Sequence, residues 1–157
     1  MTERIPIIHP QEPPHIRDVP TPTRQPRRIL LADNDRALRR MIAATLSFYG
    51  YTVEQAGSGL VLQDRLRRLL QGGGPPDLII ADFRMPGLTG LDVLRTIRRW
   101  KWGTPFLLIT ASDDEEIHDQ ARRQGVDAIL IKPFDVEDLY AVSLYLIRRS
   151  VLHQRRG

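Results

Sequence analysis

The chain alternates short apolar runs with longer segments in which apolar residues recur every three or four positions. Short apolar runs are typical of strands buried on both faces of a sheet, and the longer spacing is typical of amphipathic helices. The pattern predicts strands near residues 28–32, 51–55, 77–81, 105–109 and 127–131. It predicts helices near residues 35–48, 59–70, 90–100, 113–124 and 135–152. This alternation favours one α/β domain with a parallel sheet and crossover helices.

Capping and breaking residues place several of these boundaries. Asp35 is suited to cap the first helix, and Gly50 stands where a C-terminal glycine would end it. The Gly-Gly-Gly-Pro-Pro run at 72–76 separates the second helix from the third strand. We therefore expect a single folded domain over residues 27–152, followed by a short basic tail at 153–157.

The N-terminal segment, residues 1–26, has a different composition. It holds seven of the 12 prolines, and proline resists both helix and sheet. We expect an extended or disordered tail that is not part of the fold. Proline-rich segments also dock in aromatic grooves, so a partner-binding arm and an inert leader are both open.

Four of the predicted strands end at residues suited to phosphate chemistry. The first runs into Asp33 and Asn34, and the third runs into Asp82. The fourth ends at Thr110 and the fifth at Lys132. The carboxyl ends of parallel strands meet at one edge of the sheet, where open α/β folds place their chemistry. We expect these side chains to converge in one pocket.

Each residue type has a distinct role available in such a pocket. A carboxylate such as Asp82 can attack phosphorus and form an acyl phosphate. Clustered oxygens around Asp33 attract a hard dication such as Mg2+, and Lys132 offers a mobile charge for a phosphate. Taken singly, these residues read as a turn acid, a strand-end threonine and a solvated lysine. Their convergence favours the functional interpretation.

Together these blocks resemble the single-domain, CheY-like receivers of response regulators in two-component systems. The matching runs are residues 29–35, 77–82, 85–87 with Gly90, 109–111 and 132–134. The resemblance covers residues 28 to about 150 in the family's order and spacing. It implies a flavodoxin-like doubly wound (βα)5 fold with a five-stranded parallel sheet of order 2-1-3-4-5.

The resemblance also implies a function and a set of roles. Asp82 would take a phosphoryl group from a sensor histidine kinase or a phosphotransfer protein of a phosphorelay, with bound Mg2+. Thr110 and Lys132 would hold the phosphoryl oxygens. The implied metal ligands are Asp33, Asn34, Asp82 and the backbone carbonyl of Arg84. Such a protein is not an enzyme beyond self-catalysed phosphotransfer to its own aspartate and auto-dephosphorylation, and its output passes through protein contacts.

Two residues depart from the family pattern. Asn34 replaces a second acid that normally contacts the metal, so we expect weaker Mg2+ binding. Asp35 would not compensate if it caps the helix, because its side chain would then point away. Ile129 stands where the family often has a Tyr or Phe that rotates inward, and a β-branched side chain cannot make that movement. These departures favour a second interpretation, a receiver-like binding module that does not use phosphate.

A third interpretation is a haloacid-dehalogenase type phosphatase, suggested by the acids that follow the first strand. That family needs a Thr or Val near residues 36–37 and an acidic pair after a further strand beyond the lysine, and this chain has neither. Asp82 and the 85–87 turn would also be unexplained. We therefore disfavour it.

The predicted last helix carries two apolar stripes. One stripe consists of Leu139, Val142 and Leu146. The other consists of Tyr140, Leu144, Ile147 and Val151. A helix packed on a sheet buries one stripe, so we expect the second to mediate a homodimer or an output contact, or to lie under the N-terminal segment.

Bulk properties exclude several classes of protein. The net charge is +4 and the basic residues are 21 Arg and two Lys, which we attribute to codon bias, so no direct nucleic-acid binding is expected. The chain has no cysteine, which excludes disulfides and thiolate metal sites. No apolar stretch approaches the roughly 20 residues of a membrane span, and no signal peptide is recognisable. We expect a cytoplasmic protein.

Overall fold

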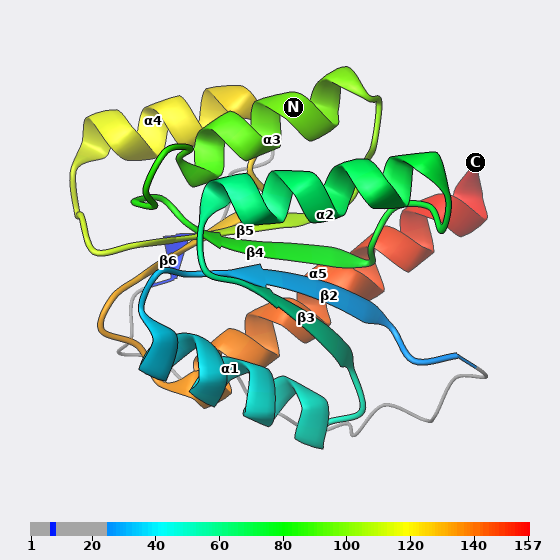
Figure 1. Cartoon of the computed structure of the whole chain (residues 1–157), viewed down its shortest axis with the longest axis horizontal. Helices are drawn as coiled ribbons and strands as arrows, with labels where there is room; N and C mark the ends of the chain where they lie inside the picture. Colours follow the sequence, from blue (N-terminus) through cyan, green and yellow to red (C-terminus); the bar gives the residue numbers. More distant parts are fainter. Residues whose placement is uncertain (1–6, 9–24) are drawn as a thin grey trace.

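The strands of the computed structural model form one sheet with helices on both faces (Figure 1). The structure describes residues 7–8 and 25–157. Its strands are β1 (Ile7–Ile8), β2 (Arg28–Ala32), β3 (Thr52–Ala56), β4 (Leu78–Asp82), β5 (Phe106–Thr110) and β6 (Ala128–Ile131). Its helices are α1 (Arg36–Phe48), α2 (Gly59–Gln71), α3 (Gly90–Arg99), α4 (Glu115–Gln124) and α5 (Val136–Arg156). The predicted strands all lie within one residue of these bounds.

Every strand pair in the described part of the chain is parallel, and the sheet order is β1-β6-β5-β4-β2-β3. Strands β2 to β6 correspond to the five predicted strands. Numbered 1 to 5 along the chain, these five strands have the order 2-1-3-4-5 in the sheet. The predicted flavodoxin-like fold is therefore confirmed. The order changes direction between β2 and β4, and this switch point brings Asp33 beside Asp82.

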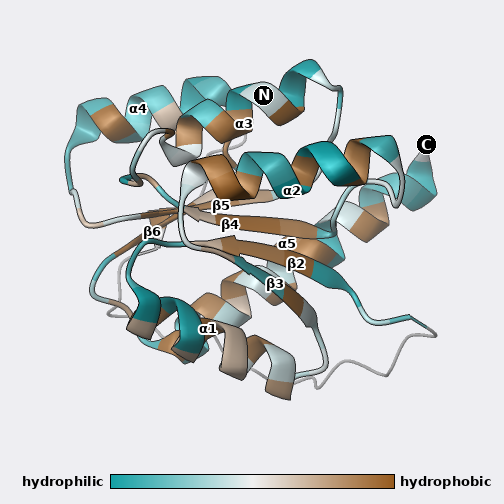
Figure 2. Cartoon of the chain, viewed as in Figure 1, coloured by the Kyte–Doolittle hydropathy of each residue, from teal (hydrophilic) through white to brown (hydrophobic). Residues whose placement is uncertain are grey.

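Alternate residues of the central strands face opposite layers of helices. Leu30 and Ile79 belong to a buried cluster under α2, α3 and α4, whereas Ile29 and Ile80 belong to a cluster under α1 and α5. The central strands β4 and β5 are consequently apolar up to their last residues, Asp82 and Thr110, and the polar residues of the helices face outward (Figure 2). Burial on both faces explains why these strands appear in the sequence as continuous apolar runs.

The expectation that the N-terminal segment stays outside the fold needs a correction. Ile7 and Ile8 form β1, which extends the sheet by pairing in parallel with β6. Two consecutive β-branched residues suit an extended strand, and β6 offers them an open edge. The other residues of the predicted tail, 1–6 and 9–24, lie outside the described residues.

Helix α5 differs from its prediction in length. It continues to Arg156, four residues beyond the predicted end at 152. The basic residues expected to form a short tail therefore belong to the helix. Among the described residues, no helix combines the length and apolar character needed to cross a membrane.

The expectation that the second stripe of α5 is free for a homodimer or an output contact needs a correction. Tyr140 and Ile147 are buried, and Leu144 and Val151 are half-buried. The reason is that α5 lies beside α1 on the same face of the sheet, so α5 has two covered sides. The ring of Tyr140 stacks on the ring of Tyr49 at the end of α1, with centroids 3.7 Å apart. The stripe is therefore mainly a packing surface within the chain.

Candidate functional site

Asp82 is the last residue of β4 and is almost completely buried. Its Oδ1 accepts a hydrogen bond from the backbone N–H of Arg84 at 3.0 Å. Its Oδ2 accepts one from Nζ of Lys132 at 2.6 Å. Gly90 lies against the Asp82 carbonyl, where a Cβ atom would be 2.7 Å from the oxygen. The carboxylate is thus fixed through both oxygens at the carboxyl edge of the sheet.

Asp33 follows β2 and is fully buried beside Asp82. Its Oδ1 accepts a hydrogen bond from the backbone N–H of Asp35 at 2.8 Å. Its Oδ2 lies 3.2 Å from Lys132 Nζ, which is an ion-pair distance, but receives no hydrogen bond of good geometry from any described residue. One ammonium group therefore connects the two predicted acids.

The two residues after Asp33 have different positions. Asn34 is exposed at the rim of the site. Asp35 is the N-cap of α1, and its Oδ1 accepts a hydrogen bond from the N–H of Leu38 at 3.1 Å. This contact turns the Asp35 carboxylate toward the helix, as the capping argument predicted. Asp35 therefore does not supply the charge that Asn34 lacks.

Thr110 and Lys132 end neighbouring strands. The hydroxyl of Thr110 is buried and accepts a hydrogen bond from the N–H of Ser112 at 3.0 Å. The Thr110 carbonyl accepts one from the N–H of Lys132 at 2.8 Å. A cis peptide joins Lys132 to Pro133 as the chain leaves β6. The structure thus brings Asp33, Asp82, Thr110 and Lys132 to one edge of the sheet, as the sequence predicted.

Burial and charge set the protonation of this group. Burial raises the pKa of Asp33, and the nearby charge of Asp82 adds to that effect, while the Asp35 N–H and Lys132 oppose it. Burial by itself would lower the pKa of Lys132. The hydrogen bond and charge of Asp82, together with Asp33, outweigh burial, and the pKa of Lys132 is raised. Lys132 is therefore held as a cation between two acids.

The donor set fits a magnesium ion that keeps several of its waters. Within residues 7–8 and 25–157, no three or more His, Cys, Asp or Glu side chains gather closely enough to form a metal site by themselves. Magnesium commonly uses only one or two carboxylates in proteins. Asp33 Oδ2 is a buried oxygen without a hydrogen bond, next to the Asp82 carboxylate. Such an oxygen is suited to a hard cation.

Sequence reasoning missed three residues around the site. Arg39 of α1 donates from Nη1 to the Asp33 carbonyl at 2.7 Å. His118 of α4 is fully buried, and its Nε2 lies 3.1 Å from the Ser112 carbonyl. These residues and Ser112 hold the loops that carry Asp33 and Thr110. An arginine and a histidine on polar helices give no sequence signal for such contacts.

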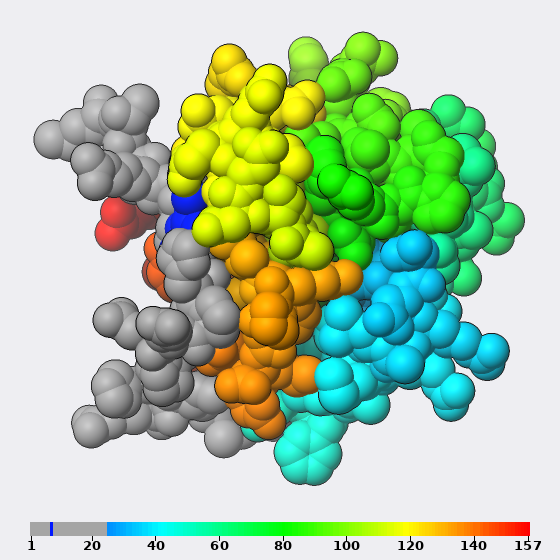
Figure 3. All heavy atoms as spheres, turned by 90° about the vertical axis from the view of Figure 1, so that its left-hand side faces the viewer, coloured from blue at the N-terminus to red at the C-terminus, as the bar shows by residue number. Residues whose placement is uncertain are grey.

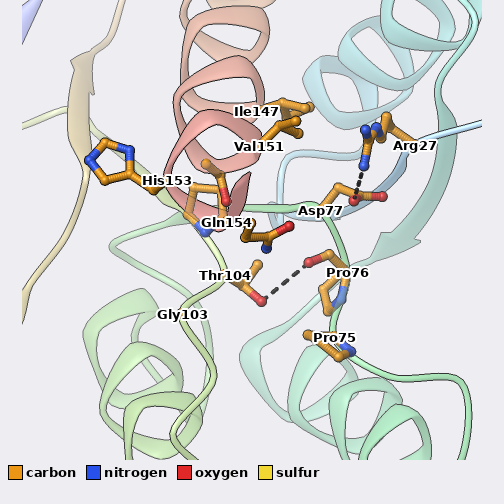
Figure 4. A pocket seen from close by; sticks show the side chains of 12 residues that line it. Arg27, Pro75, Pro76, Asp77, Gly103, Thr104, Ile147, Val151, His153 and Gln154 are labelled. Atoms are coloured by element: carbon orange, nitrogen blue, oxygen red, sulfur yellow. Dashed lines mark hydrogen bonds and ion pairs between the residues drawn. The ribbon is translucent and has the colours of Figure 1, made fainter. Parts of the chain in front are cut away.

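A pocket of about 360 Å³ lies at the opposite, amino edge of the sheet. Figure 4 shows Ile147 and Val151 of α5 on one side of it. Arg27 pairs with Asp77 at 3.2 Å, and the hydroxyl of Thr104 donates to the Pro76 carbonyl at the same distance. These contacts join the loops that precede β2, β4 and β5. The pocket shares no residue with the candidate site.

Comparison with known proteins agrees with the fold. Residues 29–143 match the family model of the response regulator receiver domain. The chain belongs to this family, whose members act in two-component signalling.

The relatives include both full regulators and isolated domains. The response regulator MprA of Mycobacterium sp. (strain KMS) is 38% identical over 125 residues, which is 80% of this chain and 52% of that protein. MprA of Mycobacterium avium (strain 104) is 37% identical over 123 residues, 78% of this chain and 52% of that protein. The chain thus spans about half the length of the curated relatives it matches.

Solved receiver structures are covered almost completely. The chemotaxis protein CheY4 of Vibrio cholerae has a TM-score of 0.70 at 27% identity, over 78% of this chain and 99% of that one. The receiver domain of the Francisella response regulator 1452 has a TM-score of 0.71 at 25% identity, over 79% of this chain and 98% of that one. Both support the assignment of the fold.

Proposed function

We propose that this chain is a phosphoacceptor switch whose Asp82 receives a phosphoryl group from a phosphohistidine. The donor is a sensor histidine kinase or a phosphotransfer protein. The contact that supports this most directly is the 2.6 Å hydrogen bond from Lys132 to Asp82, at a sheet edge that also holds Asp33 and Thr110. A buried carboxylate held in this way is a suitable nucleophile for phosphorus.

Asp82, Lys132 and Thr110 each have a separate role in this reaction. An Asp82 oxygen attacks phosphorus while the P–N bond to the donor imidazole breaks, and an acyl phosphate results. Lys132 is close enough to Asp82 to pair with a phosphoryl oxygen, and we propose that the Thr110 hydroxyl donates to another. The Ser112 N–H fixes that hydroxyl through its oxygen and leaves its proton available.

Magnesium would be held by Asp33, Asn34, Asp82 and the carbonyl of Arg84. When bound, the ion would neutralise charge on the transferring phosphoryl group. Asn34 gives this chain one charge less than the family pattern, so we propose that it binds Mg2+ weakly and is phosphorylated slowly. The reaction is self-catalysed, and we propose no turnover of a separate substrate.

We propose that the signal leaves this protein through contacts with another protein and not through a reaction on a separate substrate. Phosphorylation would draw the Thr110 hydroxyl toward the phosphoryl group, and Ser112 and His118 would transmit this movement to α4. In this chain Ile129 is fully buried where the family often carries a mobile aromatic ring. We therefore propose that the β5–α4 loop carries the signal to an output partner, and that the protein acts in the cytoplasm.

Phosphorylation with acetyl phosphate and Mg2+ tests this proposal. Intact-mass measurement is expected to show one added phosphoryl group, which hydroxylamine removes and which Asp82→Asn abolishes. Asp77→Asn, at the residue that directly precedes the same strand, serves as the matched control and is expected to retain the label. If the unmodified chain takes up no label under conditions that label a known receiver, the phosphate-independent binding module becomes the better interpretation.

A further inference from the structure

Without β1, strand β6 would form the edge of the sheet, and its composition is that of an edge that pairs readily with another chain. Its four residues, Ala128–Ile131, are all apolar and all buried. One side of the strand pairs with β5, and the other side pairs with β1. A flat apolar edge without charged residues readily pairs with another chain, and proteins commonly cover or charge such edges. In this molecule β1 provides the cover.

β1 is short and yet well matched to this edge. Ile7 is in register with Ile129, and Ile8 is in register with Leu130. Ile7 is half-buried and packs against the cluster that contains Ile129 and Ala121 of α4. The spheres of β1 accordingly lie beside those of α4 in Figure 3. Two residues offer few main-chain hydrogen bonds, so this cover is suited to reversible release.

The length of the connection allows β1 to come from the same molecule. The sheet order places β1 four strand spacings from β2, a lateral distance of about 19 Å. The residues numbered 9–27 join the two strands, and an extended chain of that length reaches roughly 60 Å. A strand in the same chain thus reaches the edge with length to spare.

We propose that Ile7–Ile8 is a detachable cap that keeps the chain monomeric, and that its release lets β6 pair with β6 of a second copy. In a two-fold dimer the same surface meets itself, so the two strands would run antiparallel across the axis. An apolar, uncharged edge satisfies that arrangement without repulsion between like charges. This inference concerns the edge of the sheet and does not depend on phosphorylation of Asp82.

Paired substitutions in the full chain test the cap. Ile7→Asp with Ile8→Asp removes the apolar strand, whereas Ile7→Val with Ile8→Val keeps two β-branched residues and serves as the matched control. Sedimentation velocity over a roughly hundredfold concentration range is expected to show a monomer for the natural chain and the valine variant. The aspartate variant is expected to form a dimer that grows with concentration.

Hydrogen exchange of β6 tests whether β1 covers the edge separately from whether the uncovered edge pairs with a second copy. At the lowest concentration, amides of 128–131 in the aspartate variant are expected to exchange about tenfold faster than in the valine variant. Unchanged exchange would show that β1 does not cover the edge. Faster exchange in a chain that stays monomeric at every concentration would show that the edge does not self-pair. Either result overturns the proposal.

The absence of cysteine from the chain permits a direct test of where the strand comes from. Ile7→Cys with Ile129→Cys places two thiols on paired residues of neighbouring strands, at a separation within the disulfide range. Oxidation is expected to give a cross-linked monomer on a non-reducing gel, reversed by reductant. A covalent dimer would mean that the strand comes from a second copy, and would contradict the cap.

Discussion

Lys132 Nζ lies 2.6 Å from Oδ2 of Asp82, although 50 positions separate the two residues in the sequence. The same ammonium lies 3.2 Å from Oδ2 of Asp33. Both carboxylates are nearly inaccessible to solvent, whereas the lysine side chain is 23% exposed. One partly hydrated cation therefore compensates two buried acids, and this relation makes the site sensitive to any change of charge.

Lys132→Ala is expected to lower the free energy of unfolding by about 2 kcal/mol without divalent ions. Breaking a buried ion pair costs about 3–5 kcal/mol, and the partial exposure of Lys132 reduces that figure. Mg2+ is expected to restore part of the loss, because a dication replaces the missing positive charge. Urea unfolding with and without Mg2+ measures both effects.

Lys101→Ala is the control for that experiment, because Lys101 is the chain's other lysine and is exposed. Its unfolding free energy is expected to stay within about 0.5 kcal/mol of the natural chain. Equal losses for the two variants would show that Lys132 does not compensate the buried acids.

Asp33→Asn is expected to stabilise the protein near neutral pH in the absence of Mg2+. Burial, followed by the charge of Asp82, raises the pKa of Asp33 above 3.8, so the folded protein holds this proton more tightly than the unfolded chain. Stability from this group is therefore present below pH 3.8 and is lost as the pH rises through the raised pKa. The asparagine side chain has no such proton to lose, so the Asp33→Asn variant does not suffer this loss of stability.

Urea unfolding from below pH 3.8 up to neutral pH provides the measurement. The advantage of Asp33→Asn over the natural chain is expected to grow as the pH rises, and then to level off. Asp113→Asn, at an exposed acid of the β5–α4 loop, is the matched control for the change of charge. A difference between the natural chain and Asp33→Asn that does not vary with pH would contradict the prediction.

The fold could be predicted because its main signals are local. The apolar runs at residues 29–32, 78–81 and 106–109 are buried on both faces, so each run marks a strand whatever surrounds it. The acids, the threonine and the lysine follow these runs directly. Parallel topology then brings them together, and the sequence was sufficient to locate the candidate site.

Features that depend on contacts between distant segments could not be predicted. β1 consists of two residues in a proline-rich segment, too few for any periodicity. The stripe of α5 appeared to be surplus because periodicity does not reveal that α1 lies alongside and buries Tyr140 under Tyr49. The ion pairs of Lys132 likewise depend on how far a flexible side chain extends, which only the folded structure shows.

Asn34→Asp is expected to tighten Mg2+ binding about tenfold. A unit negative charge near 4 Å from a dication contributes about 2 kcal/mol in water, and salt screening reduces this at an exposed position. Asn34 is exposed, and Asp35 is engaged with Leu38 and does not substitute for it. Isothermal titration of the natural chain, Asn34→Asp and the neutral control Asn34→Gln measures the three Kd values. Equal Kd values for all three would remove Asn34 from the metal site.

Gly90→Ala is expected to destabilise the protein by about 2 kcal/mol and to slow phosphorylation of Asp82. The new Cβ would lie 2.7 Å from the Asp82 carbonyl oxygen and 3.0 Å from Cδ1 of Leu108, and the backbone atom cannot move without shifting the end of β4. Gly103→Ala is the matched control, because a Cβ there meets nothing within 4 Å. Urea unfolding gives the stability of each variant, and acetyl phosphate labelling gives its rate. If the two variants are equally stable and are labelled equally fast, Gly90 does not position Asp82.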